Sequence, residues 1–489
     1  MFEVDLLTAG AVGVIILSIY HYVAKQYEYF LTKPVPCVKP TFGFGSTAPT
    51  LFRTMDISSL VKKLYNAYPD SKISGFYDLL RPIYILRDPE VIKKIAVKDF
   101  DYFTDHQVAI NFPEDEDAGS SLFGNSLFSL RGQKWRDMRA TLSPAFTGSK
   151  MRHMFELVAE CGRSMVEFFA SEAKAGKTLE FEMKDVCSRF SNDVIATVAF
   201  GISVNSLRDR ENEFYVNGKQ ILNFQSIMVL IKFLLFRAFP RLMQKLEVDF
   251  SDRKMTEYFK NMIIDNMKQR EAHAIARNDM IQMLMEVRKG FDTVSSCMTF
   301  LAYELTVNTD IQKRLYEEVL ETDQSLGGKP LNYDALQKMQ YMDMVVSESL
   351  RKWPPFVVSD RLCVKNYRYD DGSGAQFTVE KGQTMWFPTI ALHRDPRYYP
   401  NPDQFDPERF SEENRSSINT GAYIPFGVGP RNCIGSRLAL MEVKSMVYYL
   451  LKEFSFEPTE KTQIPLRLSK SGFAMLSEKG VWLELKPRK

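Results

Sequence analysis

Residues 426–435, FGVGPRNCIG, place a single cysteine inside a glycine-rich turn. Gly427 and Gly429 allow a backbone geometry that a Cβ would obstruct, so several N–H groups can point at one sulfur. The residues after Gly435 predict a helix that begins beside this sulfur. Backbone donors and a helix N-terminus both favour thiolate over thiol. Cys433 is therefore predicted to be anionic and to act as a ligand.

The full pattern Phe-x-x-Gly-x-Arg-x-Cys-x-Gly is present, which argues against a structural cysteine buried in a tight turn. A single thiolate on one face of a planar iron porphyrin donates electron density to the iron and favours O–O cleavage. We therefore expect Cys433 to ligate the iron of haem b. Arg431 can meet an anionic group and Phe426 opens the pattern, so both are expected to contact the cofactor.

With these residues the chain resembles the microsomal cytochromes P450, and it is most similar to insect detoxification-type members. The resemblance covers nearly the whole chain, and further motifs follow in the family's order. Glu348 and Arg351 of ESLR share one helix face, and Arg409 follows in FDPERF. The resemblance implies that these three charges form a buried network beneath the haem. It also implies a mainly helical cytochrome P450 fold with a smaller β region.

Several cationic and aromatic side chains match the positions at which the family holds the haem propionates. WRDMR at 135–139 places Trp135 and Arg139 one helical turn apart, so both can donate to one carboxylate. The resemblance assigns four side chains to the propionates: Trp135, Arg139, Arg361 and Arg431. Nearby Lys134 and Arg136 fit an exposed face for an acidic electron donor.

The stretch EVRKGFDTVSSCMTFLAYELT, residues 286–306, resembles the family's oxygen-activating helix. Gly290, Asp292 and Thr293 match the motif, which implies that Thr293 donates a hydrogen bond to dioxygen and that Asp292 relays protons. Lys289 departs from it, because the family has a small residue there. An ammonium group in a dry pocket would be costly to desolvate.

The residues before this motif depart further from the family. Residues 277–290, RNDMIQMLMEVRKG, resemble a short helix that normally comes well before the long one. The linking loop and the first half of the long helix are therefore expected to be missing, a loss of tens of residues. A skipped exon or a shortened gene model would produce such a join.

Two interpretations of the join remain open. In the first, residues 280–288 replace the missing half and one helix runs through Gly290, with Thr293 facing the iron. In the second, Lys289-Gly290 ends one helix and Asp292 caps the next, which leaves the distal wall open to water. Gly past a helix end and Asp at a helix start are ordinary capping choices, so local chemistry favours the second.

The overall composition limits the classes of protein to which the chain can belong. The chain has 489 residues, 45% of them hydrophobic, and a formal charge of +2, which fits a large core and argues against a general nucleic-acid binder. The six cysteines are scattered without a CxxC pair, so neither a disulfide framework nor a zinc site is indicated. No linker follows residue 50, which predicts one large unit at residues 51–489.

The N-terminus predicts membrane attachment. Residues 6–24 contain no Asp, Glu, Lys or Arg and span roughly 28 Å as a helix, close to one hydrocarbon core. Lysines follow this run, which places the rest of the chain on the cytosolic side of the endoplasmic reticulum membrane. We therefore expect an anchor at residues 1–25 and a proline-rich connector at 26–50. Residues 227–246 are either core helices broken at Pro240 or a surface that dips into the same membrane.

Alternating patterns locate the β region. Residues 72–87 predict two strands, Asp88-Pro89-Glu90 predicts a helix start, and residues 367–387 and 461–487 predict further strands. Helical periodicity dominates from about 130 to 350 and returns at 436–454. Loop residues that could line a substrate site follow from the resemblance: Phe123, Leu127, Phe128, residues 355–360 and residues 471–473.

Together these features predict a haem-thiolate monooxygenase that inserts one oxygen atom into lipophilic small molecules. No strand–GxGxxG–helix unit is visible, so electrons must come from a separate protein, by resemblance the NADPH–cytochrome P450 reductase, with cytochrome b5 as a second donor. The alternative is a haem- or substrate-binding protein impaired by the shortened distal helix before Gly290. A further alternative is a chain that cannot retain haem.

Overall fold

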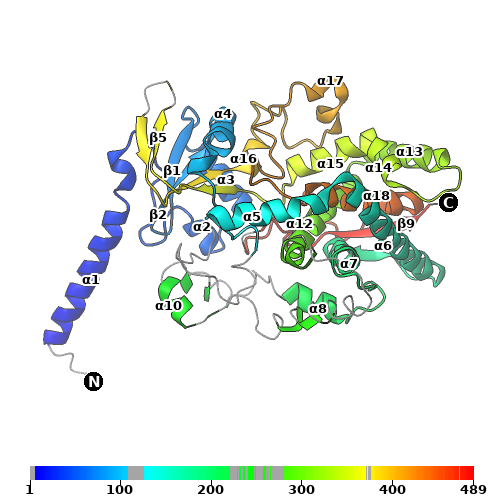
Figure 1. The fold of residues 1–489 in the computed structure, drawn as a ribbon, viewed down its shortest axis with the longest axis horizontal. Helices are drawn as coiled ribbons and strands as arrows, with labels where there is room; N and C mark the ends of the chain where they lie inside the picture. Colours follow the sequence, from blue (N-terminus) through cyan, green and yellow to red (C-terminus); the bar gives the residue numbers. More distant parts are fainter. Residues whose placement is uncertain are drawn as a thin grey trace.

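Two layers of structure, one rich in strands and one helical, lie side by side along the long axis of the molecule (Figure 1). The computed structural model describes residues 6–107, 126–220, 228, 231–232, 235–236, 240–246, 248, 257–259, 261–262, 265, 280–370, 372, 376–472 and 474–488. Along residues 280–291 it describes the path of the helical backbone and not the side chains.

The principal sheet joins strands from both halves of the chain in the order β1-β2-β7-β4. β1 (Ile73–Asp78) and β2 (Arg81–Leu86) form the predicted antiparallel pair. β7 (Thr384–Phe387) runs parallel to β2, and β4 (Ser359–Leu362) is antiparallel to β7. This pairing fixes Arg361 opposite Met385, and the Arg361 guanidinium donates to the carbonyl of Val428 in the cysteine turn.

Two smaller sheets complete the β region. β5 (Tyr367–Asp370) pairs with β6 (Gln376–Val379), which together with β7 confirms the strands predicted within 367–387. β3 (Glu180–Glu182), β9 (Trp482–Pro487) and β8 (Phe454–Pro458) form a three-stranded sheet. The prediction for 461–487 is correct only for β9, because Gly472 and Gly480 adopt positive φ and break any longer pairing.

Among the described residues, far more lie in helices than in strands, as predicted. Their bounds are α1 (Leu6–Gln26), α2 (Ala48–Leu51), α3 (Ile57–Asn66), α4 (Pro89–Lys93), α5 (Gly132–Leu142), α6 (Gly148–Lys174), α7 (Met183–Ile195), α8 (Glu213–Gln220), α10 (Pro240–Lys245), α12 (Met280–Val307), α13 (Thr309–Ser325), α14 (Tyr333–Lys338), α15 (Gln340–Lys352), α16 (Thr389–Leu392), α17 (Glu412–Arg415) and α18 (Ser436–Glu453). α4 begins as expected, because the Asp88 carboxylate accepts from the amides of Glu90 and Val91.

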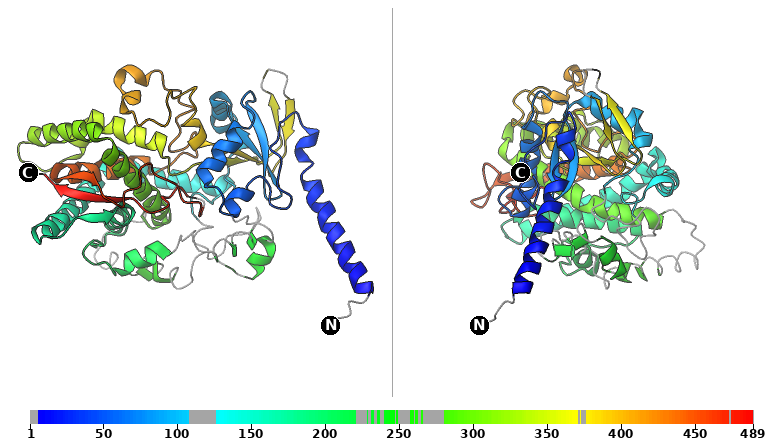
Figure 2. Two further views of the ribbon diagram at one scale, coloured as in Figure 1. Left: turned by 180° about the vertical axis from the view of Figure 1, so that it is seen from behind. Right: turned by 90° about the vertical axis from the view of Figure 1, so that its left-hand side faces the viewer.

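α12 and α18 pass through the middle of the helical layer, where α6 and α7 cover them (Figure 2). From Val294 to Leu305 the side chains of α12 are buried on every side, as expected for a helix that is apolar around most of its circumference. The same core includes Met441, Met446 and Leu450 of α18. These two helices therefore form a rigid support for whatever lies between them and the sheet.

The path of α12 decides between the two interpretations of the join. The helix runs without interruption from Met280 through Gly290 to Val307. The interpretation favoured by local capping chemistry, with Asp292 as the N-cap of a second helix, is therefore wrong. The Asp292 carboxylate bonds Lys184 of α7, so contact between two helices overrides the local preference. The side chain of Lys289 lies outside those described.

The N-terminal helix α1 extends away from the body of the molecule and exposes large apolar side chains such as Val14, Ile16 and Leu17 (Figures 1 and 2). Among the described residues, no helix combines the length and the hydropathy needed to cross a bilayer. The segment after α1 packs on the sheet: Phe30 is buried, and Cys37 pairs with Gly75 of β1. The expected connector is thus held against the body over part of its length.

Candidate active site

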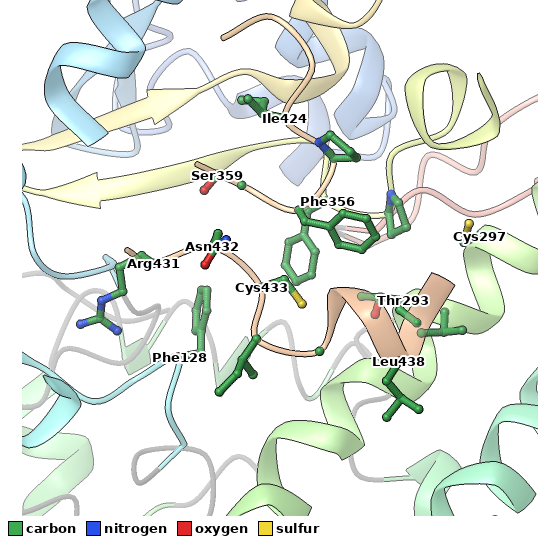
Figure 3. A pocket seen from close by; sticks show the side chains of 18 of the residues that line it. Phe128, Thr293, Cys297, Phe356, Ser359, Ile424, Arg431, Asn432, Cys433 and Leu438 are labelled. Carbon is green, nitrogen blue, oxygen red and sulfur yellow. The ribbon is translucent and has the colours of Figure 1, made fainter. Parts of the chain in front are cut away.

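A cavity of about 300 Å³ lies between α12, the cysteine turn before α18 and the end of β4. Six of the predicted site residues line it: Trp135, Arg139, Thr293, Phe426, Arg431 and Cys433. Figure 3 shows that the side chains of Cys433 and Thr293 come to this pocket from different elements, the turn and α12. Residues distant in sequence are thereby brought to one cavity.

Backbone hydrogen bonds and a glycine fix the shape of the cysteine turn. The Cys433 amide donates to the Phe426 carbonyl at 2.9 Å, and the Asn432 amide donates to the Gly429 carbonyl at 3.0 Å. Gly429 has φ +75°, and a Cβ there would lie 2.1 Å from the carbonyl oxygen of Ala96, so only glycine fits. The turn therefore cannot relax without moving the neighbouring chain.

Cys433 differs from the other cysteines in exposure. Its side chain is exposed and lines the cavity, whereas the other five cysteines are buried or partly buried. Burial raises the pKa of Cys297, which also lines the cavity, to about 12 and keeps that thiol neutral. α18 begins at Ser436, so Cys433 lies just before a helix N-terminus, where a thiolate is stabilised.

Arg139 supports the turn from α5. Its guanidinium donates to the carbonyl and to the side-chain oxygen of Asn432, both at 2.9 Å. These two bonds fix the residue next to Cys433 and leave Arg139 at the wall of the cavity. An arginine with a fixed fork is suited to a planar carboxylate.

Arg431 is almost fully buried beside Trp135. It donates to the carbonyls of Thr104, Leu127 and Leu130 at 2.6, 3.2 and 2.8 Å, and it pairs with Asp105 at 3.0 Å. Its guanidinium carbon lies 4.0 Å from the centre of the Trp135 ring. Burial lowers the pKa of Arg431 to about 9, with Asp105 opposing the shift, so the group keeps its charge at neutral pH.

Arg361 is fully buried in β4 and does not line the cavity. It donates to the carbonyls of Asp360 and Val428 at 2.7 and 2.8 Å, which joins the sheet to the cysteine turn. Burial lowers its pKa to about 10. Its Nε–H finds no acceptor among the described residues. A buried guanidinium with an unused donor fits a site that takes an anionic group, so the donor set is compatible with haem carboxylates.

His106 and Asp360 also line the cavity, and sequence reasoning missed His106. Its Nδ1 lies 3.0 Å from the Asp360 carboxylate, which also accepts from the amide of Gln107 at 2.6 Å. The ring stacks on Phe128 at 4.4 Å between centroids, and burial lowers its pKa. The two partners lie far apart in sequence, so no spacing could have revealed them.

Other expected lining residues are distributed unevenly. Leu127, Phe128 and much of the segment 355–360 line the cavity, including Phe356. The expected lining residue Phe123 and the end of the 471–473 segment, Phe473, lie outside the described residues. Among the described residues, Ser471 does not reach this cavity.

The two residues of the expected oxygen-activating pair go to different places. Thr293 lines the cavity, but Asp292 does not. The Asp292 carboxylate pairs with Lys184 at 2.8 Å and is partly exposed. The geometry therefore brings Thr293, and not Asp292, into the pocket that contains Cys433.

The charge network implied by ESLR and FDPERF lies beneath the turn. Arg351 donates to both oxygens of Glu348 at 2.6 and 2.7 Å, and both side chains are 0% exposed. Arg409 approaches the same carboxylate at 3.6 Å. Arg351 also donates to the carbonyl of His393, whose Nε2 accepts from the amide of Ile424. The network therefore reaches the start of the cysteine turn.

A mainly helical body that presents an exposed cysteine, the partly buried Arg139 and the buried Arg431 to one cavity has the features of the class of haem-thiolate proteins. Residues 34–483 match the family model described as Cytochrome P450, and the chain belongs to that family. The family comprises monooxygenases that bind haem through a cysteine thiolate.

Curated relatives agree with this membership. The chain is 43% identical to the probable cytochrome P450 9f2 of Drosophila melanogaster, over 96% of this chain and 97% of that protein. It is 39% identical to cytochrome P450 9e2 of Blattella germanica, over 98% of this chain and 97% of that protein. This second alignment extends over 527 positions, more than the 489 residues of the chain, so the chain lacks residues that this relative has.

Proposed function

We propose that this chain holds haem b in the cavity through Cys433 and inserts one oxygen atom from O2 into lipophilic small molecules. The observation that carries the proposal is the position of the exposed Cys433 in the lining of a cavity that Arg139 and Arg431 also line. When bound, the haem supplies the oxidising chemistry. The protein's own residues would bind and orient the haem and the substrate and would supply the protons.

The cationic edge is suited to the two haem propionates. Arg139 and Arg431 line the cavity with Trp135, and Arg361 lies directly behind with an unused N–H. In a water-poor site, charge-assisted bonds to carboxylates are the strong ones. These four side chains would hold the anionic edge of the haem and fix its rotation relative to Cys433.

The remaining wall is apolar and favours lipophilic substrates. Leu127, Phe128, Val294 and Phe356 line it, and these side chains offer no charge to a polar ligand. Thr293 brings a hydroxyl to this wall. In the proposal, Thr293 donates a hydrogen bond from its Oγ to the oxygen to be activated. Asp292, expected to relay protons, lies outside the cavity, so water in the cavity would have to supply them.

Electrons would come from a separate protein, for which NADPH–cytochrome P450 reductase is the proposed donor, with cytochrome b5 as a second. Lys134 and Arg136 are exposed on α5, the helix that also carries Arg139. A basic face there would attract an acidic partner close to the cysteine turn.

The proposed location is the endoplasmic reticulum membrane, with the catalytic body, residues 51–489, on the cytosolic side. The run without charge at 6–24 and the exposed apolar side chains of α1 support attachment through residues 1–25. Exposed Ile231, Leu235 and Leu242 support a second contact with the membrane from 227–246. Deleting residues 1–25 would test the attachment. We expect the shortened chain to move from the membrane fraction to the soluble fraction.

The second candidate is a chain that binds haem or substrate without productive turnover. The segment expected from the sequence to be missing before Gly290 favours it, because a shortened distal helix would admit water to the cavity. Turnover with added reductase separates the two candidates. Product formation supports the monooxygenase, whereas NADPH consumption that yields only hydrogen peroxide supports the impaired protein.

The experiment that tests the haem site itself is a reduced, carbon-monoxide-treated difference spectrum of the full chain and of Cys433→Ala. We expect a thiolate-type Soret band in the unaltered chain and its loss in the variant. An unchanged band in Cys433→Ala would refute the assignment of the axial ligand. Absence of the band in both proteins would favour a chain that cannot retain haem.

A further inference from the structure

One lysine holds the turn of α12 that carries Thr293. Lys184, at the start of α7, places its Nζ 2.8 Å from the Asp292 carboxylate and 3.0 Å from the Asp292 carbonyl. The same Nζ lies 2.8 Å from the hydroxyls of Ser295 and Ser296. An ammonium group has three N–H bonds, so four acceptors share them. We call this cluster the Lys184 bridge.

The bridge acts on the helix backbone as well as on side chains. The Asp292 carbonyl also accepts from the hydroxyls of Ser295 at 3.1 Å and Ser296 at 2.8 Å. Bonds from a serine hydroxyl to the carbonyl one turn earlier tend to bend a helix. Three donors other than a backbone amide therefore converge on one carbonyl, in the turn that presents Thr293 to the cavity.

The position of Asp292 argues against a role for its carboxylate inside the cavity beside Thr293. Its carboxylate is 45% exposed and lies outside the cavity lining, whereas the Lys184 side chain is 23% exposed. Ser295 is fully buried between the two helices. The charge of Asp292 is thus committed to α7, on a different side of α12 from Thr293.

We infer that Lys184 is a positioning residue, which fixes the register of α12 against α7 so that the Thr293 hydroxyl faces the haem cavity. This inference rests on the proposed haem site. According to this inference, Asp292 anchors α12, and only the Thr293 hydroxyl takes part in the reaction. Asp292 and Lys184 then form one functional unit.

The test uses full-length holoprotein and reads the surroundings of bound carbon monoxide by the C–O stretching band. Thr293→Ala defines the shift that follows loss of the hydroxyl. We expect Lys184→Met to move or broaden the band in the same direction, and Lys184→Arg to restore it. Lys177→Met is the matched control, because Lys177 forms an ion pair of similar length, 2.7 Å, with Glu172 outside the cavity.

A turnover readout separates anchoring from proton relay. If Asp292 anchors, Asp292→Asn and Lys184→Met should each raise hydrogen peroxide released per NADPH by a similar factor, roughly three-fold for a partly exposed pair. The double variant should be no worse than either single one. If Asp292→Asn is severe and Lys184→Met is silent, Asp292 relays protons and the inference is overturned.

Two failures remain distinguishable. A wild-type chain without a thiolate-type carbon monoxide band would overturn the proposed haem site and this inference with it. If the wild-type band is normal and Lys184→Met leaves the C–O stretching band unchanged, only this inference is overturned, and the proposed haem site stands. If Lys184→Met loses haem through misfolding, the C–O band of Asp292→Asn becomes the test, because that variant keeps the shape of the side chain. An unchanged band in Asp292→Asn would also overturn the inference.

Discussion

The two sides of the cavity are built by different means. The cysteine turn takes its shape from its own glycines and from bonds among near neighbours, such as Cys433 to Phe426. Remote side chains such as Arg139 then support a turn that is already shaped locally. The Thr293 side is specified at a distance, by Lys184 on another helix. The contrast teaches that a local motif can be interpreted from sequence, whereas a helix that depends on a remote partner can contradict its own capping signals.

The largest expected effect would come from the charge network beneath the turn. Arg351→Ala leaves the Glu348 carboxylate buried with only Arg409 nearby, and a buried charge that loses its partner costs about 3–5 kcal/mol. We expect the variant to lose haem rather than to slow turnover. The carbon monoxide difference spectrum per unit of protein measures this.

The control for that variant is Arg152→Ala, which removes an exposed pair with Asp334. It should keep the haem content of the unaltered chain, because exposed pairs contribute about 0–1 kcal/mol. Full haem content in Arg351→Ala would show that the turn does not depend on the network.

A smaller effect should follow from a methyl group in the turn. Gly429→Ala forces a Cβ to 2.1 Å from the Ala96 carbonyl at a positive φ, which we expect to cost about 2–3 kcal/mol and part of the haem content. Gly435→Ala is the matched control, because its Cβ would meet nothing closer than 4.0 Å. Thermal unfolding of both holoproteins measures the difference, and equal stability would show that the turn tolerates a side chain at Gly429.

The α18 side of the cavity can be examined through pH. Burial raises the pKa of Glu442 to about 8 from an ordinary 4.5, so the folded state binds a proton that the unfolded state has released between these values. The contribution of Glu442 to stability is thus fully present below about pH 4.5 and is lost as the pH rises towards 8. Glu442→Gln should therefore stabilise the protein by on the order of 2 kcal/mol at pH 8 and by little at pH 5.

Chemical denaturation at the two pH values would measure this difference. A variant that is equally stabilised at both would show that the pKa of Glu442 is not raised on folding, because only a difference between the folded and unfolded pKa values makes the effect depend on pH.

The smallest expected effect concerns the serines of the Lys184 bridge. Replacing Ser295 and Ser296 together by alanine removes two bonds to the Asp292 carbonyl and two from Lys184, but it leaves the ion pair with Asp292, so the free energy of unfolding should change by about 1–2 kcal/mol. Thermal unfolding would check it. A loss as large as that of Arg351→Ala would mean that the serines, and not Lys184, hold the helix.

Sequence reasoning reached far where neighbours decide the structure. The strands at 73–86, the cap at Asp88 and the helix from Ser436 all form as predicted, because turn, cap and alternation signals lie within a few residues of the element. The cavity lining by Cys433, Arg431 and Trp135 followed from motifs of the family.

It failed where partners are remote. Asp292 carries good capping chemistry, yet Lys184, 108 residues earlier, supplies its partner. His106 shows no spacing signal, because its contact with Asp360 depends on a loop returning to the edge of β4. The role of Arg361 as a propionate ligand stays a prediction: pairing with β7 fixes its strand, and Arg361 is not among the residues that line the cavity.

The order of the principal sheet has a consequence for how the chain is made. The parallel partner of β2 is β7, which leaves the ribosome only after every helix from α3 to α15 has been synthesised. At about 5–20 residues per second, the β1–β2 hairpin would wait roughly 15–60 s with an unpaired edge. Unpaired strand edges invite association with other chains. Protein quality control during translation, more than equilibrium stability, should therefore limit the yield of this enzyme.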